Sequence, residues 1–487
     1  MKRFWLVLLS LGLIAAFSTQ ALAVDVKFSG EYFAAGMYLD RVGVNETTYG
    51  VNNDEGLNAD THTAFYYQRL RLTTTFVVHP GLFFITRADV MERAWGAPRF
   101  NPAGGVGAAD DRSAGTRAEN ENIAFDLAYV QYVSPIGIFL AGYQIDNVWG
   151  TTFGDTSQPT PKIGYMLPIP GVKGLLLGLQ TGKNPDGERS WGTWNGSVRN
   201  GAVDRDNNFY TAFVRYATKG IETGILFKYI RNATNRNVFG ELGLVPEGGI
   251  KAQQFIATPY AKVQAGPVAV EGQIYYLTGR VVREGWAWAI PPASNGGETQ
   301  RLDAWSAYLS ATADFGIAYA GGTFAWISGD KQETGDKLEG ALTGGLDWNP
   351  CLIMFNSERN YWTGAIAAYD GKSNGAPMSN AFFAQLRAGV KPIDKLDVMA
   401  SLSWAKMHIS DARSLGVQSG RDYGWEIDVT GTYKITNNLS YMLGGGYWFV
   451  GKYYKGVGLA GESDASGVYY GNVKNDFMVI NKLTLTF

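Results

Sequence analysis

Two segments near the start of the chain carry charged side chains at alternate positions of an otherwise apolar run. Arg69 and Arg71 alternate with leucines in FYYQRLRLTTTF, and Arg87, Asp89 and Arg93 continue the pattern after a tight HPGL. In a strand, alternate side chains lie on the same face of the sheet. Guanidinium and carboxylate groups on one face can attract or repel ions, whereas the other face suits apolar surroundings. The spacing therefore predicts a sheet with one wet, charged face and one apolar face.

Segments with this period-two alternation recur along the whole chain, and we count about eighteen of them. They span residues 26–39, 63–78, 82–95, 123–133, 138–145, 163–167, 175–181, 209–218, 221–231, 253–265, 268–279, 302–314, 317–328, 381–391, 396–409, 423–436, 439–450 and 477–487. Every other connection is a tight turn rich in Gly, Pro, Asn or Asp. This arrangement is typical of outer-membrane barrels, with short turns on the periplasmic side. We predict an all-β fold, a transmembrane up-and-down antiparallel β-barrel of about 18 strands.

The connections between the tight turns are long and polar, and we expect them to be extracellular. They span residues 40–62, 96–122, 183–208, 232–252, 280–301 and 329–380, the last being the longest. Three segments have the size to fold into the barrel: 96–122, 146–162 and 329–380. The apolar NPCLIMF in 329–380 suggests packing within the barrel, and we expect its Cys351 to be a small buried residue rather than a reactive one.

The first 23 residues are typical of a secretory signal peptide. Lys2 and Arg3 precede the apolar residues 4–17, and Ala21-Leu22-Ala23 forms an A-x-A cleavage site. We therefore predict a signal peptide over 1–23 and a barrel with long extracellular loops over 24–487. Removal of the two basic residues leaves 40 Lys+Arg against 44 Asp+Glu, a net charge of −4. This balance argues against binding to nucleic acid, which favours a basic excess.

Alternation also predicts which charged side chains line the lumen. We expect them to bias which ions pass; the alternative is that they bond only to one another and to water, and so stiffen the barrel. The predicted lumen and selectivity residues are Arg69, Arg71, Arg87, Asp89, Arg93, Asp126, Arg215, Lys228, Lys262, Arg387, Glu426 and Asp428. Glu92 is placed on the opposite face, with Ala88 and Val90.

Catalysis finds little support in the sequence. G-x-S-x-G, H-E-x-x-H and P-loop patterns do not occur in a convincing context. The three histidines, His62, His79 and His408, are far apart, and spacing does not link any of them to a nucleophile. The single cysteine excludes an internal disulfide and a thiolate metal cluster. We predict no enzyme, no catalytic residue, no metal site and no cofactor.

The YYQRLRLTTTF segment and the terminal INKLTLTF, ending in Phe487, resemble those of a bacterial outer-membrane porin. Within that group, the arginine-bearing QRLRL strand and the chain length are similar to the alginate-export family of barrels. The resemblance implies an anion-selective channel with Arg69, Arg71, Arg87 and Arg93 along the solute path. It also implies that Phe487 is recognised by the barrel-assembly machinery. This lumen departs from the family pattern in carrying many acidic residues.

These observations predict a porin of the bacterial outer membrane for passive diffusion of small hydrophilic solutes, anions included. Two alternatives stay open: a dedicated exporter of an anionic polysaccharide such as alginate, and a barrel that sheathes an electron-transfer partner. The expected partners are outer-membrane lipid, small hydrophilic solutes and the assembly machinery. A homo-oligomer is compatible with the sequence.

Overall fold

The computed structural model describes most of the chain from residue 24 onward. The described residues are 24–40, 62–96, 123–183, 206–235, 249–284, 299–331, 334–363, 377–409, 420–453 and 475–487. The predicted signal peptide and the segment 97–122 lie outside them.

The described residues form one sheet of eighteen long strands and a two-residue strand, β14 (Lys337–Leu338). The long strands are β1 (Asp25–Leu39), β2 (Thr63–His79), β3 (Leu82–Ala94), β4 (Ile123–Ser134), β5 (Gly137–Asp146), β6 (Gln158–Pro168), β7 (Leu175–Lys183), β8 (Asn207–Thr218), β9 (Ile221–Asn235), β10 (Gly249–Ala265), β11 (Val268–Glu284), β12 (Thr299–Asp314), β13 (Ala318–Ile327), β15 (Ala381–Ile393), β16 (Leu396–Met407), β17 (Asp422–Lys434), β18 (Leu439–Val450) and β19 (Asp476–Thr486). Each of the eighteen predicted strands is present, and β14 was not predicted.

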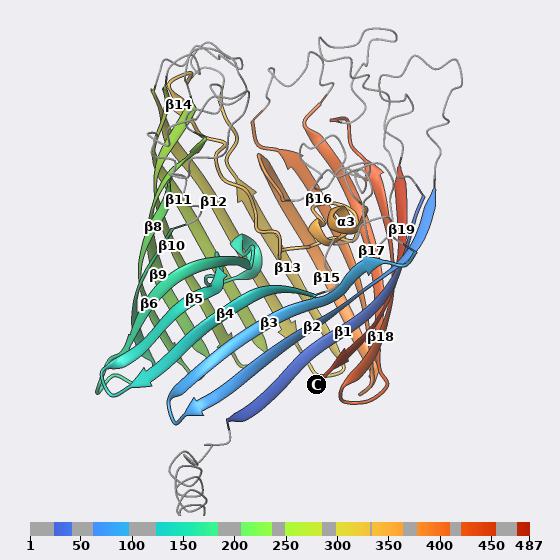
Figure 1. The fold of residues 1–487 in the computed structure, drawn as a ribbon. Coiled ribbons are helices and arrows are strands. Elements are labelled where there is room, and N and C mark those ends of the chain that lie inside the picture. The colour runs from blue at the N-terminus through green and yellow to red at the C-terminus, as the bar shows by residue number, and fades with distance from the viewer. Residues whose placement is uncertain are drawn as a thin grey trace, which may run out of the picture.

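The sheet closes on itself, which confirms the predicted barrel. Each long strand pairs antiparallel with the next, β13 pairs directly with β15, and β19 returns to β1 with Glu31 opposite Thr486. Figure 1 shows the tilted strands, with the short turns gathered at the end of the barrel where the C-terminus lies. Closure gives each of the eighteen long strands in the described chain a partner on both sides, as a barrel in lipid requires.

The two faces of the wall differ as the alternation predicts. Ile427 and Val429 of β17 are 43% and 51% exposed on the outer face, whereas Glu426 and Asp428, which alternate with them, are buried on the inner face. An apolar exterior around a polar interior is the arrangement that lipid outside and water inside impose. It agrees with the outer-membrane localisation expected from the sequence.

Aromatic rings also pair on the outer surface of the wall. Tyr66 and Trp95 stack with centroids 5.2 Å apart, and Tyr276 lies 4.2 Å from Trp305. Tyr66, Trp95 and Trp305 are all exposed. Amphipathic rings in such places suit the interface between lipid and water.

A β-bulge in β3 changes the alternation near the end of this strand. Met91 has a left-handed φ of 53°, and the pairing with β2 shifts between Gln68 and Leu70. A bulge places two residues opposite one and moves later side chains to the other face. Arg93 therefore lies opposite Gln68, and Glu92 comes beside Arg69. Plain alternation had placed Glu92 on the other face.

Two short helices interrupt the connections that enter the barrel. The 3-10 helix η1 (Thr152–Gly154) lies between β5 and β6, and α3 (Ser357–Thr363) lies between β14 and β15. Figure 1 shows α3 inside the ring of strands, in the opening above β1 to β3. None of the helices in the described ranges is long and apolar enough to cross a membrane.

Candidate functional site

Two connections fold into the lumen and form the candidate site together with the charged wall. We call residues 147–157, between β5 and β6, the first inward loop. The second inward loop is residues 328–380, between β13 and β15, of which 328–331, 334–363 and 377–380 are described. The segment 329–380 was expected to pack within the barrel, and its described parts do so. The segment 146–162 was one of three with the size to fold inward, and it also does so.

The first inward loop crosses to strands far from its own hairpin. The indole N–H of Trp149 donates to the Thr258 carbonyl oxygen at 2.9 Å. The Thr151 backbone N–H and hydroxyl both donate to Gln273 Oε1 at 2.7 Å, and Gln273 Nε2 returns a bond to the Trp149 carbonyl oxygen at 2.8 Å. One buried amide of β11 thus satisfies three polar groups of the loop, which fixes the loop against the β10–β11 wall.

The second inward loop bonds to the opposite part of the wall. The backbone N–H groups of Ile353 and Met354 donate to the two carboxylate oxygens of Glu426 at 2.6 and 2.7 Å. Gln385 Nε2 donates to the Pro350 carbonyl oxygen at 2.7 Å. Because these backbone groups are buried, the wall carboxylate and amide replace the water that they would otherwise need.

Helix α3 carries the second inward loop to the β1–β2 wall. The Trp362 ring lies 4.4 Å from the Tyr67 ring and contacts Phe33 edge-on at 6.3 Å. Arg359 and Asp476, both buried, approach to 3.6 Å. These contacts form the apolar centre of the molecule, which lies inside the barrel rather than between two layers.

The two inward loops also bond to each other. The Gly345 N–H donates to the Phe153 carbonyl oxygen at 2.7 Å, and the Asp347 N–H donates to the Asp155 carbonyl oxygen at 3.0 Å. The Phe153 ring meets Trp348 edge-on at 5.1 Å. The loops therefore narrow the lumen as one connected partition, held to the wall on several sides.

Asp155 is a titratable group within this partition. Its carboxylate accepts the Trp149 backbone N–H at 2.8 Å. Partial burial, reinforced by the nearby Asp347, raises the pKa of Asp155 to about 6, although the bond from Trp149 and the charge of Lys262 act in the opposite direction. The charge of the partition therefore changes within the mildly acidic range.

Three of the four arginines in the predicted cluster, Arg69, Arg71 and Arg87, lie on one inner surface, and each has a carboxylate partner. Arg93 was also expected in the lumen, but the bulge at Met91 moves it to the outer face, opposite Gln68. Arg71 makes two bonds to Asp89 at 2.7 and 2.6 Å, and Arg87 bonds to Asp126 at 3.0, 2.9 and 2.5 Å. Arg69 contacts Glu92 at 3.2 Å. Three positive charges thus face three negative ones, so this sector is not a basic surface.

Other predicted lumen cations are also paired. Arg215 lies 2.6 Å from Glu222, which accepts a second bond from the Tyr260 hydroxyl at 2.8 Å. Lys228 approaches Asp146 to 2.5 Å. A second lysine, Lys162, reaches the other oxygen of Asp146 at 3.2 Å.

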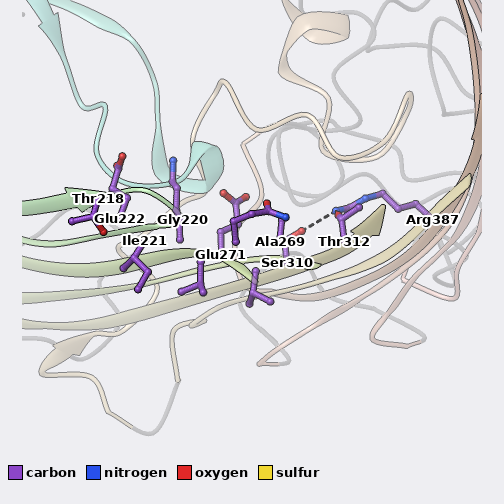
Figure 2. Close-up of a pocket in the computed structure, with 13 residues that line it drawn as sticks. Thr218, Gly220, Ile221, Glu222, Ala269, Glu271, Ser310, Thr312 and Arg387 are labelled. Carbon is purple, nitrogen blue, oxygen red and sulfur yellow. Dashed lines mark hydrogen bonds between the residues drawn. The ribbon is translucent and has the colours of Figure 1, made fainter. Parts of the chain in front are cut away.

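Lys262 and Arg387 differ from these cations, since neither has an acidic partner within 4.0 Å among the described residues. Arg387 bonds only to hydroxyls, those of Thr323, Ser310 and Thr312, at 2.7, 3.0 and 2.5 Å. Both cations line a cavity of about 400 Å³ near the short-turn end of the barrel, with Glu222 and Glu271. Figure 2 shows Arg387 extending toward Ser310 and Thr312. Glu271 lies on the adjacent strand β11, and Glu222 lies on β9, two strands further along the wall.

Some residues of the site carry no signal in the sequence. Gln273 and Trp149 are more than 120 positions apart, and Glu92 reaches Arg69 only because of the bulge at Met91. Alternation along the strand could have placed Gln273 on the inner face, but no local sequence pattern shows which residues it contacts.

The three histidines lie apart from one another and from any catalytic arrangement in the described chain. His79 contacts the carbonyl oxygen of its neighbour Pro80, and His62 lies beside the Tyr38 ring. His408 Nδ1 accepts the Gly329 backbone N–H at 3.0 Å, so it holds the start of the second inward loop. Each contact is structural.

Comparison with known proteins identifies channels of similar fold. No family model and no curated protein matches the chain. Solved structures that resemble it include the outer membrane channel DcaP of Acinetobacter baumannii (11% identity, TM-score 0.42, covering 97% of this chain and 99% of that one). An anion-selective porin from Comamonas acidovorans is also similar (12% identity, TM-score 0.41, covering 95% of this chain and 99% of that one). So is the outer membrane protein OpdK from Pseudomonas aeruginosa (10% identity, TM-score 0.48, covering 95% of this chain and 99% of that one). At these values the likeness concerns the fold alone, and no function is taken from it.

Proposed function

We propose that the chain is a passive channel of the bacterial outer membrane for small hydrophilic solutes, in which anions are favoured. The observation that carries this proposal is the pair Lys262 and Arg387, which face a cavity beyond the partition without acidic partners within 4.0 Å in the described residues. An eighteen-stranded barrel is wide enough for an aqueous passage that inward loops then narrow. We place the short turns in the periplasm, as in other outer-membrane barrels. The cavity then lies on the periplasmic side of the two inward loops.

The paired arginines act differently from the unpaired cations. Arg71 and Arg87, each bonded to an aspartate, present fixed dipoles to a passing solute rather than net charge. Selectivity for anions is therefore assigned to Lys262 and Arg387, and the arginine cluster mainly shapes and stiffens the wall. From the sequence, anion selectivity was expected of the arginine cluster instead.

The two alternative functions have less support. An exporter of an anionic polymer requires cations along the whole path, whereas three of the clustered arginines are neutralised by Asp89, Asp126 and Glu92. A sheath for another protein requires a vacant interior, whereas the chain's own inward loops lie there. Recognition of Phe487 by the assembly machinery and homo-oligomer formation stay predictions from the sequence.

The proposal is tested by swelling of liposomes that contain the purified protein. Glucuronate, glucose and glucosamine have nearly the same size and differ in charge. A unit charge about 7 Å from a passing ion contributes about 0.6 kcal/mol in water, which is about threefold in local concentration. We expect glucuronate to enter fastest and glucosamine slowest. The Lys262→Gln/Arg387→Gln double variant should reduce the ratio of the glucuronate rate to the glucosamine rate by about three- to fivefold. The change is not larger because salt screens part of the attraction.

Lys395→Gln is the matched control, because Lys395 is an exposed residue in the short turn after β15. It removes the same charge at the same end of the barrel and should leave the order and the ratio unchanged. Swelling with none of the three sugars, or fastest entry of glucosamine, would overturn the proposal.

A further inference from the structure

The fold brings together three potential metal ligands that the sequence keeps apart. Cys351 of the second inward loop meets Glu426 and Asp428 of β17, with one ligand atom from each side chain lying within 4.8 Å of the others. All three residues are buried. The sequence shows no metal motif here, because more than seventy positions and two strands separate Cys351 from the two carboxylates.

The two carboxylates lack a cationic partner. No Lys or Arg lies within 4.0 Å of Glu426 or Asp428 among the described residues, whereas the buried carboxylate of Asp146 on the other side of the lumen has two lysines. Two adjacent buried carboxylates repel each other and lose hydration, so they favour a compensating cation. The chain provides none from its described side chains.

One oxygen of the cluster is also without a hydrogen bond. Asp428 is 4% exposed, and its Oδ1 has no hydrogen-bond partner in the described residues, whereas its Oδ2 accepts a long bond of 3.4 Å from the Ser401 hydroxyl. The backbone N–H of Leu352 also interacts with this carboxylate. Oδ1 and Glu426 Oε1 both lie beside Gly446. A Cβ built on this glycine would lie 2.5 Å from Oδ1 and 3.4 Å from Oε1, so a larger residue here would crowd both oxygens.

We propose that Cys351, Glu426 and Asp428 bind a divalent metal ion of borderline softness, with zinc as the best-matched ion. A thiolate with two carboxylates is a donor set that suits zinc better than magnesium or calcium. Glu426 keeps a second lone pair on each oxygen beside the bonds from Ile353 and Met354. Zinc bonds of about 2.0–2.3 Å place ligands roughly 3.5 Å apart. Because the three ligand atoms lie within 4.8 Å of one another, each pair needs to approach by at most about 1.3 Å on binding.

The site would cross-link the second inward loop to the wall. Cys351 belongs to the loop, and both carboxylates belong to β17. A bound ion therefore adds a metal-ligand bond at the place where Glu426 already accepts two backbone N–H groups of the loop. Metal availability would then decide how firmly the partition is held.

The test is metal loading of the purified full-length chain in detergent. The protein is stripped with a chelator, incubated with zinc and desalted, and the zinc that stays bound is counted. We expect about one zinc ion per chain, with at least a tenfold loss of affinity in Cys351→Ser and in Asp428→Asn, both of which preserve side-chain volume. Asp397→Asn is the control, because this carboxylate bonds to Tyr319 on another part of the wall.

Cobalt provides a second readout that does not depend on comparing variants of different stability. Co²⁺ bound through Cys351 should give a thiolate charge-transfer absorption in the unmodified protein, and zinc should displace it. Absence of that absorption, or retention of no zinc by the unmodified chain, overturns the proposal in favour of carboxylates that share a proton. Zinc that stays bound equally in Cys351→Ser and Asp428→Asn would be adventitious, and this too overturns it.

Discussion

The backbone N–H of Ile353 donates to Glu426 Oε1 at 2.6 Å, so a strand of the wall holds a loop that lies inside the barrel. Met354 makes the equivalent bond to Oε2 at 2.7 Å. Glu426 is fully buried, and its carboxylate therefore serves as the acceptor that water cannot provide. The narrowing of the lumen depends on contacts of this kind rather than on the barrel alone.

Removal of this acceptor should loosen the second inward loop. In Glu426→Ala, two buried N–H groups lose their partner, at a cost of about 1–3 kcal/mol for each unsatisfied donor. We expect a larger and noisier single-channel current as the loop leaves its place. Asp397→Ala removes a carboxylate elsewhere in the wall and should keep the steady current of the unmodified protein. A Glu426→Ala channel with unchanged current would show that the loop is held by other contacts.

Asp155 should make the partition sensitive to pH. Its folded-state pKa is raised from an ordinary value of 3.8 to about 6, so its contribution to loop stability is fully present below about pH 4. That contribution falls as the pH rises through 6, because the folded state disfavours the charged carboxylate. We expect current fluctuations to increase between pH 5 and pH 7. The neutral Asp155→Asn can still accept the Trp149 N–H and should show a flat response over this range.

His408 should respond to pH in the opposite direction. Burial, with the charges of Arg421 and Lys331, lowers the pKa of His408 below its ordinary value of 6.5. Its contribution is present above pH 6.5 and is lost as the pH falls through the lowered pKa, when Nδ1 no longer accepts the Gly329 N–H. Hydrogen exchange at Gly329, corrected for the intrinsic rate, should accelerate in acid.

His408→Gln is the comparison for this prediction, since its side-chain oxygen can accept the same N–H without titrating. Its exchange at Gly329 should be independent of pH over that range. An acid response that persists in this variant would assign the effect to another group.

The Arg71–Asp89 pair predicts opposite effects from its two single substitutions. Asp89→Asn leaves Arg71 with only the 4.0 Å contact to Asp126, which Arg87 already pairs, and should increase the preference for anions by about twofold. Arg71→Gln should decrease the preference by a similar factor. The double variant restores neutrality and should return close to the unmodified value. Reversal potentials under a salt gradient measure all three. Equal values in the four proteins would mean that this pair does not face the conducting path.

Much of the wall follows from local pattern, and its exceptions have local causes. The strand predicted over 163–167 begins at Gln158 in the structure. Prolines normally interrupt a strand, but Pro159 and Pro161 pair with Ile145 and Tyr143 of β5. The face of Glu92 was misplaced because a single left-handed residue, Met91, shifts the alternation. Strand number and closure needed only periodicity and turn residues.

The contacts inside the lumen could not be predicted from local sequence pattern. The apolar NPCLIMF segment indicated that the loop packs inward, and Cys351 is buried as expected. Its partners Glu426 and Asp428, however, are brought to it by barrel closure and not by any spacing in the chain. The pairing of the arginines likewise depends on register between strands, so the sequence overstated the basic character of that sector.

Single-channel recording of the purified protein in a planar bilayer under a salt gradient measures both passive permeation and the preference for anions. We expect a finite, steady conductance at neutral pH and a reversal potential whose sign shows that anions permeate faster than cations. A bilayer that stays sealed although the protein is inserted, or a reversal potential of the opposite sign, would contradict the proposed function.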